Sequence, residues 1–388
     1  MNVGILGAGQ LGRMLAMAGA RLGVRCRLFD PAAEACAGDV APVTRAAFED
    51  AAALAKWAAG LDVVTYEFEN VPVAAARELE KHVAVWPPAS ALEFCGDRLE
   101  EKTLFREIGV GTAKFARVDG EGDLAAAMAE VELPAVLKTR RMGYDGKGQA
   151  VIREANEAAA AWRAVGGAKA GGSGGMILEQ WVAFRRELSI IAVRGRDGKT
   201  VFYPLTQNHH AGGVLRVSRA PAAGTRPGGP LQVEAERIAT AALERMRYVG
   251  VLAIELFEHE GRLLANEMAP RVHNSGHWTI DGAPVSQFEN HLRAVLGLPL
   301  GTTAPVGGVA GCAGMVNLVG DVPELGVLCG VEGARVHLYG KSSRPGRKVG
   351  HVNVLAADHA ELDAKLRAVI AACAGKGIAA ADVPTELR

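Results

Sequence analysis

The chain has 388 residues, too many for one ordinary hydrophobic core, so two or three domains are expected. Hydrophobic residues make up 49% and charged residues 22%, which is typical of a soluble globular protein. Lysine plus arginine and aspartate plus glutamate number 43 each, so no net field favours nucleic acid or an anionic membrane as a partner.

The cysteines and the apolar runs predict a cytoplasmic protein without a membrane partner. None of the six cysteines forms a Cys-x-x-Cys pair or has zinc-like spacing with histidine. The N-terminus reads directly as a strand and a glycine turn, without a cationic leader or a cleavage site. No apolar run approaches the roughly 20 residues that a membrane span needs.

Residues 1–97 alternate short apolar runs with helical patterns. A helix is expected at 11–22, and strands are expected at 3–6, 25–29, 62–66 and 82–86. Strands that alternate with helices predict a parallel α/β sheet with right-handed crossovers, as in a Rossmann-like domain.

The first of these strands is followed by a glycine turn. Gly7, Gly9 and Gly12 open the helix, and Asp30 ends the next strand about 20 residues on, which matches a dinucleotide-binding fingerprint. The same spacing fits a tight turn that binds another phosphate ligand or none. Since no residues for hydride transfer follow, the motif favours the sheet more than it favours an oxidoreductase.

Residues 98–300 have an α+β pattern. Helices are expected at 98–108, 154–165 and 231–247, and strands at 114–118, 135–139, 149–152, 176–182, 187–195, 200–208 and 214–220. Asp197-Gly198 is a hairpin signal, and the glycine-rich segment 166–175 reads as a flexible surface loop. From residue 301 on, short strands at 311–319, 334–340 and 349–355 precede a helix at 359–373.

A glycine-rich loop follows the strand at 135–139. It brings Gly143, Gly146 and Gly148 together with Lys138 and Lys147, so that backbone amides and lysines can both face phosphate oxygens. The G-x-x-x-x-G-K-[ST] spacing of a Walker A loop is absent. The alternative interpretation is a cationic surface hairpin.

The strand at 176–182 is a second candidate nucleotide segment. If it is an edge strand, the backbone of residues 180–182 can hold an adenine while Glu179 accepts a hydrogen from an amino or hydroxyl group. Glu187 could then accept hydrogen bonds from ribose hydroxyls. Taken singly, each carboxylate also fits an ordinary strand residue.

The most informative motif surrounds an expected hairpin turn at 259–262. Folding back there brings Glu255 nearly opposite Glu267, with Cβ atoms roughly 5 Å apart. Two carboxylates at this distance repel each other unless a cation lies between them. Together with Asn266, they suit Mg²⁺ that carries a nucleotide phosphate. The alternative is a pair of solvated strand carboxylates, although charges in apolar strands are costly.

A basic turn at 341–348 holds Lys341, Arg344, Arg347 and Lys348. It is either a solvated loop or a clamp for a small phosphorylated substrate. The segment is too short and too poor in aromatic residues to suggest a nucleic-acid surface.

In this order the motifs resemble the ATP-grasp superfamily and, within it, the N5-carboxyaminoimidazole ribonucleotide synthetases of purine biosynthesis. The resemblance runs nearly end to end and depends on segments 7–12, 65–72, 97–98, 138–149, 266–278 and 344–351. Val272 departs from the family pattern, which usually has proline there.

The resemblance implies a Rossmann-like domain at 1–97, an ATP-grasp domain at 98–300 with a mobile lid at about 112–182, and a β-rich domain at 301–388. It also implies an ATP- and Mg²⁺-dependent ligase and the reaction that this ligase catalyses. Bicarbonate and 5-aminoimidazole ribonucleotide would give N5-carboxyaminoimidazole ribonucleotide, ADP and phosphate by way of carboxyphosphate. A homodimer is implied as well.

Site residues follow from the same resemblance by position. ATP binding is implied for Arg98, Lys138, Gly143, Tyr144, Asp145, Gly146, Lys147, Gly148, Gln149, Glu179, Gln180, Trp181, Val182, Glu187, His210, Asn266 and Glu267. Glu255 and Glu267 would bind Mg²⁺. The ribonucleotide or bicarbonate would contact Tyr144, Asp145, Arg271, His273, Lys341, Arg347 and Lys348. A catalytic role is implied for Lys138, Asp145, Arg271, Lys341 and Arg347. The segment 66–70 would shape the substrate cleft.

Three other functions fit parts of the sequence. Another ATP-grasp ligase or transformylase would use a different acyl donor or amine, which the loop at 138–149 and the turn at 341–348 argue against. An NAD-dependent dehydrogenase would need a nicotinamide-side site. A non-catalytic nucleotide sensor would not need to retain Glu255, Glu267 and Lys138.

Overall fold

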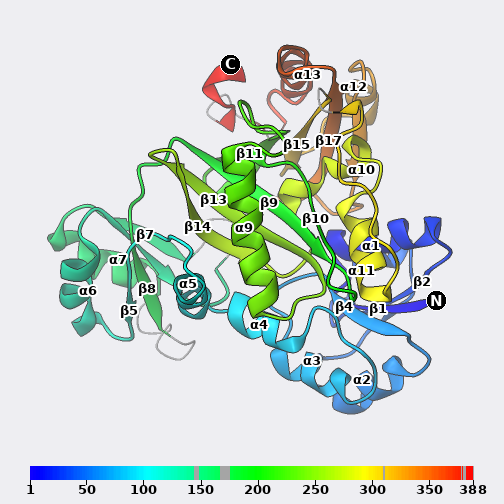
Figure 1. Cartoon of the computed structure of the whole chain (residues 1–388), viewed down its shortest axis with the longest axis horizontal. Coiled ribbons are helices and arrows are strands. Elements are labelled where there is room, and N and C mark those ends of the chain that lie inside the picture. Colours follow the sequence, from blue (N-terminus) through cyan, green and yellow to red (C-terminus); the bar gives the residue numbers. More distant parts are fainter. Residues whose placement is uncertain (144–147, 167–174, 309–310, 377, 379–381, 388) are drawn as a thin grey trace.

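The computed structural model describes residues 1–143, 148–166, 175–308, 311–376, 378 and 382–387 (Figure 1). Three β-sheets organise this part of the chain, and helices cover them. No helix among the described residues is both long enough and apolar enough to cross a membrane. Most of the surface loop predicted at 166–175 lies outside the described residues.

The N-terminal sheet is parallel, as the alternation of strands and helices predicts. Its order is β3-β2-β1-β4, with β1 at Asn2–Leu6, β2 at Arg25–Phe29, β3 at Val43–Thr44 and β4 at Val63–Tyr66. The helices here are α1 (Gln10–Arg21), α2 (Ala51–Ala58), α3 (Val73–Glu80) and α4 (Ala89–Cys95). The prediction of a strand at 82–86 is wrong, because only an isolated bridge joins Val85 to Val64. Pro87 has no N–H with which to continue the ladder.

The central sheet has the order β14-β13-β9-β11-β12-β15-β17-β16, and β10 pairs with β9. Its strands are β9 (Arg186–Arg194), β10 (Thr200–Phe202), β11 (Thr206–Ala211), β12 (Val214–Ala220), β13 (Gly250–His259), β14 (Arg262–Ala269), β15 (Cys312–Val319), β16 (Arg335–Leu338) and β17 (Lys348–Ala356). One strand was expected at 200–208, but Pro204 separates β10 from β11 because it cannot donate a ladder hydrogen bond.

Helices bury both faces of the central sheet. Alternate residues of β9 point to opposite sides, so Ile190 packs in the core that includes α9 (Pro230–Arg245) and Ile191 in the core that includes α11 (Gln287–Leu296). The second core also contains Leu15 of α1, which joins the N-terminal sheet to the central one. The shorter helices α10 (Thr279–Gly282) and α12 (Leu325–Cys329) lie on the C-terminal side.

The C-terminal strands extend the central sheet and do not form a separate one. Val316 of β15 is paired with Val217 of β12, and β17 continues the sheet from β15. Helix α13 (His359–Ala372) covers these strands, with Leu366 in the same core as Val316 and Val354. The basic turn at 341–348 leads into β17 and is therefore attached to the same sheet as Glu255 and Glu267.

The third sheet is small and antiparallel, with the order β5-β8-β6-β7. Its strands are β5 (Phe115–Val118), β6 (Ala135–Thr139), β7 (Gln149–Ile152) and β8 (Met176–Gln180). With α6 (Leu124–Val131) and α7 (Ala158–Ala164) it has a core of its own, and Figure 1 shows it at one side of the molecule. Helix α5 (Arg98–Glu107) precedes it in sequence.

Candidate active site

A cleft of about 840 Å³ brings together residues of the central sheet, the small sheet, the start of α1 and the segment after β4. This volume is within the range of small-molecule sites. Of the residues expected to bind nucleotide, metal or substrate, those that line it are Arg98, Lys138, Gly143, Gln149, Trp181, Val182, Glu187, His210, Glu255, Asn266, Glu267, Arg271, His273, Lys341, Arg347 and Lys348. Gly148, Glu179 and Gln180 do not line it. Tyr144, Asp145, Gly146 and Lys147 lie outside the described residues.

The predicted hairpin does place the two acidic residues opposite each other. Glu255 of β13 is paired with Glu267 of β14 in the antiparallel register. The register shifts after Glu255, so Asn266 is an extra residue on β14. This bulge allows the adjacent Asn266 and Glu267 both to line the cleft, although neighbouring strand residues normally face opposite sides.

The two carboxylates have very different proton affinities. Burial and the charge of Glu267 raise the pKa of Glu255 to about 7. For Glu267, burial is outweighed by Arg98, whose Nη1 lies 2.7 Å from Oε2, and its pKa falls to about 2. The shifts are opposite because Arg98 lies against Glu267, whereas Glu255 is buried beside a second carboxylate and the two repel each other when both are ionised. A cation bound between them would remove this repulsion.

The donor atoms at this hairpin fit Mg²⁺. Oδ1 of Asn266 is buried and has no hydrogen-bond partner among the described residues, while Glu255 and Glu267 provide carboxylate oxygens. In the part of the chain that the structure describes, no group of three His, Cys, Asp or Glu side chains could hold a metal. Mg²⁺ commonly uses one or two carboxylates and takes its remaining ligands from water and nucleotide phosphates, which suits this set.

Lys138 is held by a buried carboxylate. Its Nζ lies 3.0 Å from Oε2 of Glu179, and Nζ of Lys102 lies 3.3 Å from the same oxygen. Burial would raise the pKa of Glu179, but Lys102 and Lys138 lower it to about 2. Sequence reasoning missed Lys102, because a lysine in a helical pattern normally reads as solvated whereas this one is 1% exposed.

The adenine interpretation of segment 179–182 needs two corrections. Strand β8 lies between β5 and β6 and is not an edge strand. The amides of Gln180 and Trp181 donate to the carbonyls of Lys114 and Pro134 and are therefore already used. The Glu179 carboxylate points to lysines, so only Trp181 and Val182 of this segment line the cleft.

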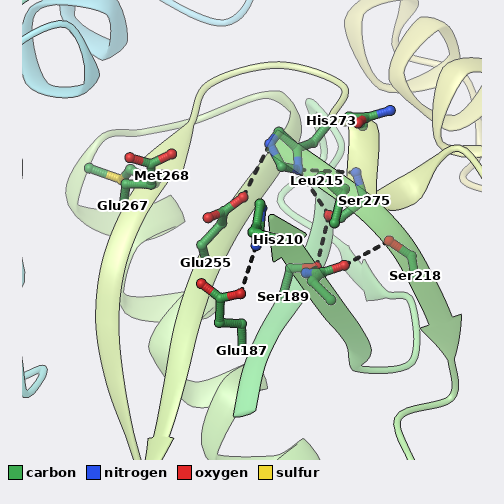
Figure 2. A network of polar contacts seen from close by, with 12 residues as sticks. Glu187, Ser189, His210, Leu215, Ser218, Glu255, Glu267, Met268, His273 and Ser275 are labelled. Atoms are coloured by element: carbon green, nitrogen blue, oxygen red, sulfur yellow. Dashed lines mark hydrogen bonds and ion pairs between the residues drawn. The ribbon is translucent and has the colours of Figure 1, made fainter. Parts of the chain in front are cut away.

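His210 and Glu187 form a pair at the cleft, with Nδ1 2.7 Å from Oε2 (Figure 2). Burial lowers the pKa of His210, but the hydrogen bond to Glu187 and the charge of Glu255 outweigh it and raise the pKa to about 9. The imidazole is therefore a cation beside the acidic pair at neutral pH.

The His210 cation should make stability depend on pH. Since the folded-state pKa lies above the ordinary 6.5, this contribution is complete below pH 6.5 and is lost as pH rises towards about 9. Urea unfolding of the wild type and of His210→Gln at several pH values measures it. The difference in unfolding free energy should shrink over that interval, and a constant difference would contradict the pairing.

The segment 66–70 connects the N-terminal sheet to the cleft. Glu69 pairs with Nε of Arg271, and Glu67 accepts hydrogen bonds from the amides of Gly9 and Gly12. Asp30 accepts a hydrogen bond from the Ala8 amide at 2.7 Å. Because carboxylates already use these amides, the glycine turn is not open to a dinucleotide pyrophosphate, and this part of the NAD interpretation fails.

The basic turn contacts the start of α1 and lines the same cleft. Lys341 donates to Oε1 of Gln10, and Nη1 of Arg347 lies 2.7 Å from Oγ of Ser342. Lys341, Arg347 and Lys348 all line the cleft, as do Glu255 and Glu267 of the acidic hairpin. The turn is thus not merely a solvated loop.

His273 lies against the acidic hairpin. Its Nε2 is 3.5 Å from Oε1 of Glu255. Burial and the charge of Arg271 lower the pKa of His273 to about 3, so the ring is neutral and the contact is not an ion pair at neutral pH. Figure 2 shows His273 with Glu255 and Glu267 around the same space.

Family models match three successive segments of the chain. They are the ribonucleotide synthetase preATP-grasp domain at 1–95, the ATP-grasp domain at 103–288, and the phosphoribosylaminoimidazole carboxylase C-terminal domain at 313–365. Their order agrees with the order of motifs along the sequence.

Similar proteins match over nearly the whole length. The N5-carboxyaminoimidazole ribonucleotide synthase of Pseudomonas aeruginosa is 48% identical, over 95% of this chain and 98% of its own. The crystal structure of the corresponding synthetase from Thermus thermophilus has 52% identity and a TM-score of 0.89, covering 97% and 100%. The Aspergillus clavatus synthase in complex with ADP and 5-aminoimidazole ribonucleotide has 27% identity and a TM-score of 0.85, covering 96% and 98%.

Proposed function

The chain belongs to the family of N5-carboxyaminoimidazole ribonucleotide synthases, ATP-dependent ligases of the ATP-grasp superfamily, and from this premise we propose its reaction and residue roles. ATP, bicarbonate and 5-aminoimidazole ribonucleotide are the substrates, and N5-carboxyaminoimidazole ribonucleotide, ADP and phosphate are the products. The observation that supports this most is one cleft lined by the acidic hairpin, Lys138 and the basic turn.

In the first step, an oxygen of bicarbonate attacks the γ-phosphorus and ADP leaves, which forms carboxyphosphate. Both reactants are anions, so their repulsion has to be offset where they meet. Lys138, Arg98 and Arg271 line the cleft and carry positive charge that is already held in place by Glu179, Glu267 and Glu69. Charges fixed in advance stabilise a transition state without reorganisation.

Glu255, Glu267 and the free Oδ1 of Asn266 would hold Mg²⁺. When bound, the ion supplies further positive charge next to the phosphates. The cationic His210 beside Glu187 compensates the negative charge of the hairpin on its other side.

In the second step, carboxyphosphate splits into CO₂ and phosphate, and the amine nitrogen attacks the carbon of CO₂. The amine loses a proton, which the released phosphate can accept. Lys341, Arg347 and Lys348 hold the ribose phosphate and thereby position the amine. The small sheet at about 112–182 acts as a lid that excludes water from carboxyphosphate.

The organisation of the chain belongs to the same proposal. Residues 1–97, 98–300 and 301–388 are the three domains. The enzyme acts as a homodimer in the cytoplasm, for which six free cysteines are suited. Light scattering of the purified chain tests the dimer.

The proposed reaction is tested by measuring ADP release and product mass with each substrate omitted in turn. With ¹³C-bicarbonate, the aminoimidazole product should carry the label, and full ADP release should need both bicarbonate and the ribonucleotide. Full ADP release without bicarbonate, or an unlabelled product, would contradict the reaction.

Arg347→Ala should raise the KM for 5-aminoimidazole ribonucleotide roughly 10- to 100-fold, because a charge-assisted hydrogen bond to its phosphate is lost. The KM for ATP should change little. Arg335→Ala is the matched control, since this arginine is 53% exposed and is absent from the cleft lining. Equal effects of Arg347→Ala on both KM values would count against the clamp.

A further inference from the structure

A row of buried polar side chains leads from the middle of the central sheet to His273 (Figure 2). Ser218 Oγ lies 2.8 Å from Oδ1 of Asn208, and Nδ2 of Asn208 lies 3.0 Å from Oγ of Ser189. Ser189 Oγ is 2.8 Å from Oγ of Ser275, which is 2.9 Å from Nδ1 of His273. The three serines are fully buried and Asn208 is 6% exposed.

The row crosses three adjacent strands before it reaches the loop. Ser189 lies on β9, Asn208 on β11 and Ser218 on β12, and Asn208 is directly opposite Ser218 in the ladder. Ser275 belongs to a 3-10 turn at Asn274–Gly276. Rigid strands therefore fix the positions of the hydroxyl groups relative to His273.

The hydrogen bonds in this row can be assigned a direction. The backbone N–H of Ser275 donates to Nδ1 of His273 at 3.3 Å, so Nδ1 carries a lone pair and the ring proton is on Nε2. The Ser275 hydroxyl donates to the same nitrogen and accepts from Ser189. Asn208 donates to Ser189 through its amide and accepts from Ser218, so all donors point towards His273.

We propose that Ser275, Ser189, Asn208 and Ser218 are positioning residues that hold His273 in its Nε2–H tautomer, with this N–H directed at the Glu255 carboxylate. Nε2 lies 3.5 Å from Oε1 of Glu255, where a lone pair on nitrogen would repel the oxygen. The row thereby orients one of the two carboxylates of the acidic hairpin. The role of this row in metal binding rests on the proposed function, whereas the assignment of the His273 tautomer does not.

The direction of the hydrogen bonds distinguishes this proposal from the alternative in which buried polar side chains only pair with one another. Asn208→Asp keeps the shape but provides only acceptors, so Ser189 would turn its hydroxyl towards residue 208. Ser275 Oγ would then donate to Ser189, which leaves Nδ1 with only the 3.3 Å contact from the Ser275 backbone N–H. Ser275→Ala removes the nearest hydroxyl outright and tests the same point if the aspartate variant does not fold.

The test is a two-bond ¹H–¹⁵N correlation spectrum of the full chain with ¹⁵N-labelled histidine, which distinguishes the two neutral tautomers. His273→Gln identifies the signal among the ten histidines. The wild type should show the Nε2–H pattern, and both variants should show a smaller share of it, because only the 3.3 Å contact from the backbone N–H of residue 275 still favours this tautomer. A wild-type Nδ1–H pattern, or unchanged patterns in folded variants, would overturn the proposal.

Asn290→Asp is the matched control, because Asn290 is also fully buried but bonds to Tyr203 and Gly301 away from the row. Its His273 signal should match the wild type.

In activity assays, Ser275→Ala should need about tenfold more Mg²⁺ for half-maximal ADP release, which is the usual size of effects from residues that hold the direct metal ligands. An unchanged Mg²⁺ requirement in a variant with an altered tautomer would overturn the link to Glu255. The spectrum needs no substrate, so it reads the tautomer even if the proposed reaction is wrong.

Discussion

Replacement of Glu267 by glutamine is expected to lower the rate of ADP formation about 1000-fold. Glu267 is the member of the acidic pair that is ionised at neutral pH, because Arg98 lowers its pKa to about 2. Glutamine keeps the shape but removes the charge that a cation needs, and it leaves Arg98 without its carboxylate partner. The measurement is kcat at saturating substrates over a series of Mg²⁺ concentrations.

Glu258→Gln is the matched control for this variant. Glu258 is also on β13 and is buried, but it pairs with Arg185 and Arg186 and does not line the cleft. Its loss should cost stability, about 3–5 kcal/mol for a broken buried pair, while the folded fraction keeps its turnover. Near-normal turnover of Glu267→Gln would remove the metal assignment.

Sequence patterns predicted the acidic hairpin because its signals are local. Two apolar runs and a turn at 259–262 determine which residues face each other, and Glu255 is indeed paired with Glu267. The bulge at Asn266 could not be predicted in this way, because an extra residue in one strand changes the pairing without changing the apolar pattern. Its effect is to bring a third oxygen donor to the cleft.

The missed strand boundaries had a signal in the sequence. Pro87 ends the pairing at Val85, and Pro204 separates β10 from β11, since neither proline has an N–H to donate. Reading the prolines as ladder breaks would have corrected both predictions. Apart from these two segments, the expected strands agree with the described ones to within a few residues.

Contacts between segments that are distant in the sequence could not be predicted from sequence patterns. Lys102 on α5 reads as a surface lysine until β8 places Glu179 against it, and Glu67 has no evident role until the glycine turn surrounds it. Such pairs depend on how the sheets pack together. Sequence reasoning predicted the side chains that line the cleft more fully than the residues that hold those side chains in place.

Lys138→Met is expected to lower kcat for ADP formation about 100- to 1000-fold, because the proposed reaction loses a fixed positive charge next to the phosphates. The variant should lose little stability, since Glu179 keeps Lys102 as a partner at 3.3 Å. Thermal denaturation and initial rates on the same preparations separate the two effects. A variant with an unchanged kcat would remove Lys138 from the phosphate site.

The double variant Lys138→Met/Glu179→Gln separates charge balance from catalysis. Removing Glu179 as well leaves Lys102 without its buried partner, so the melting temperature should fall further while kcat stays as low as in Lys138→Met. Lys102→Met is the matched control: its ammonium group contacts the same oxygen but lies 1% exposed, outside the cleft lining. It should lose more stability and less activity than Lys138→Met. The reverse order would mean that the buried pairing, and not a charge facing the phosphates, explains the loss of activity.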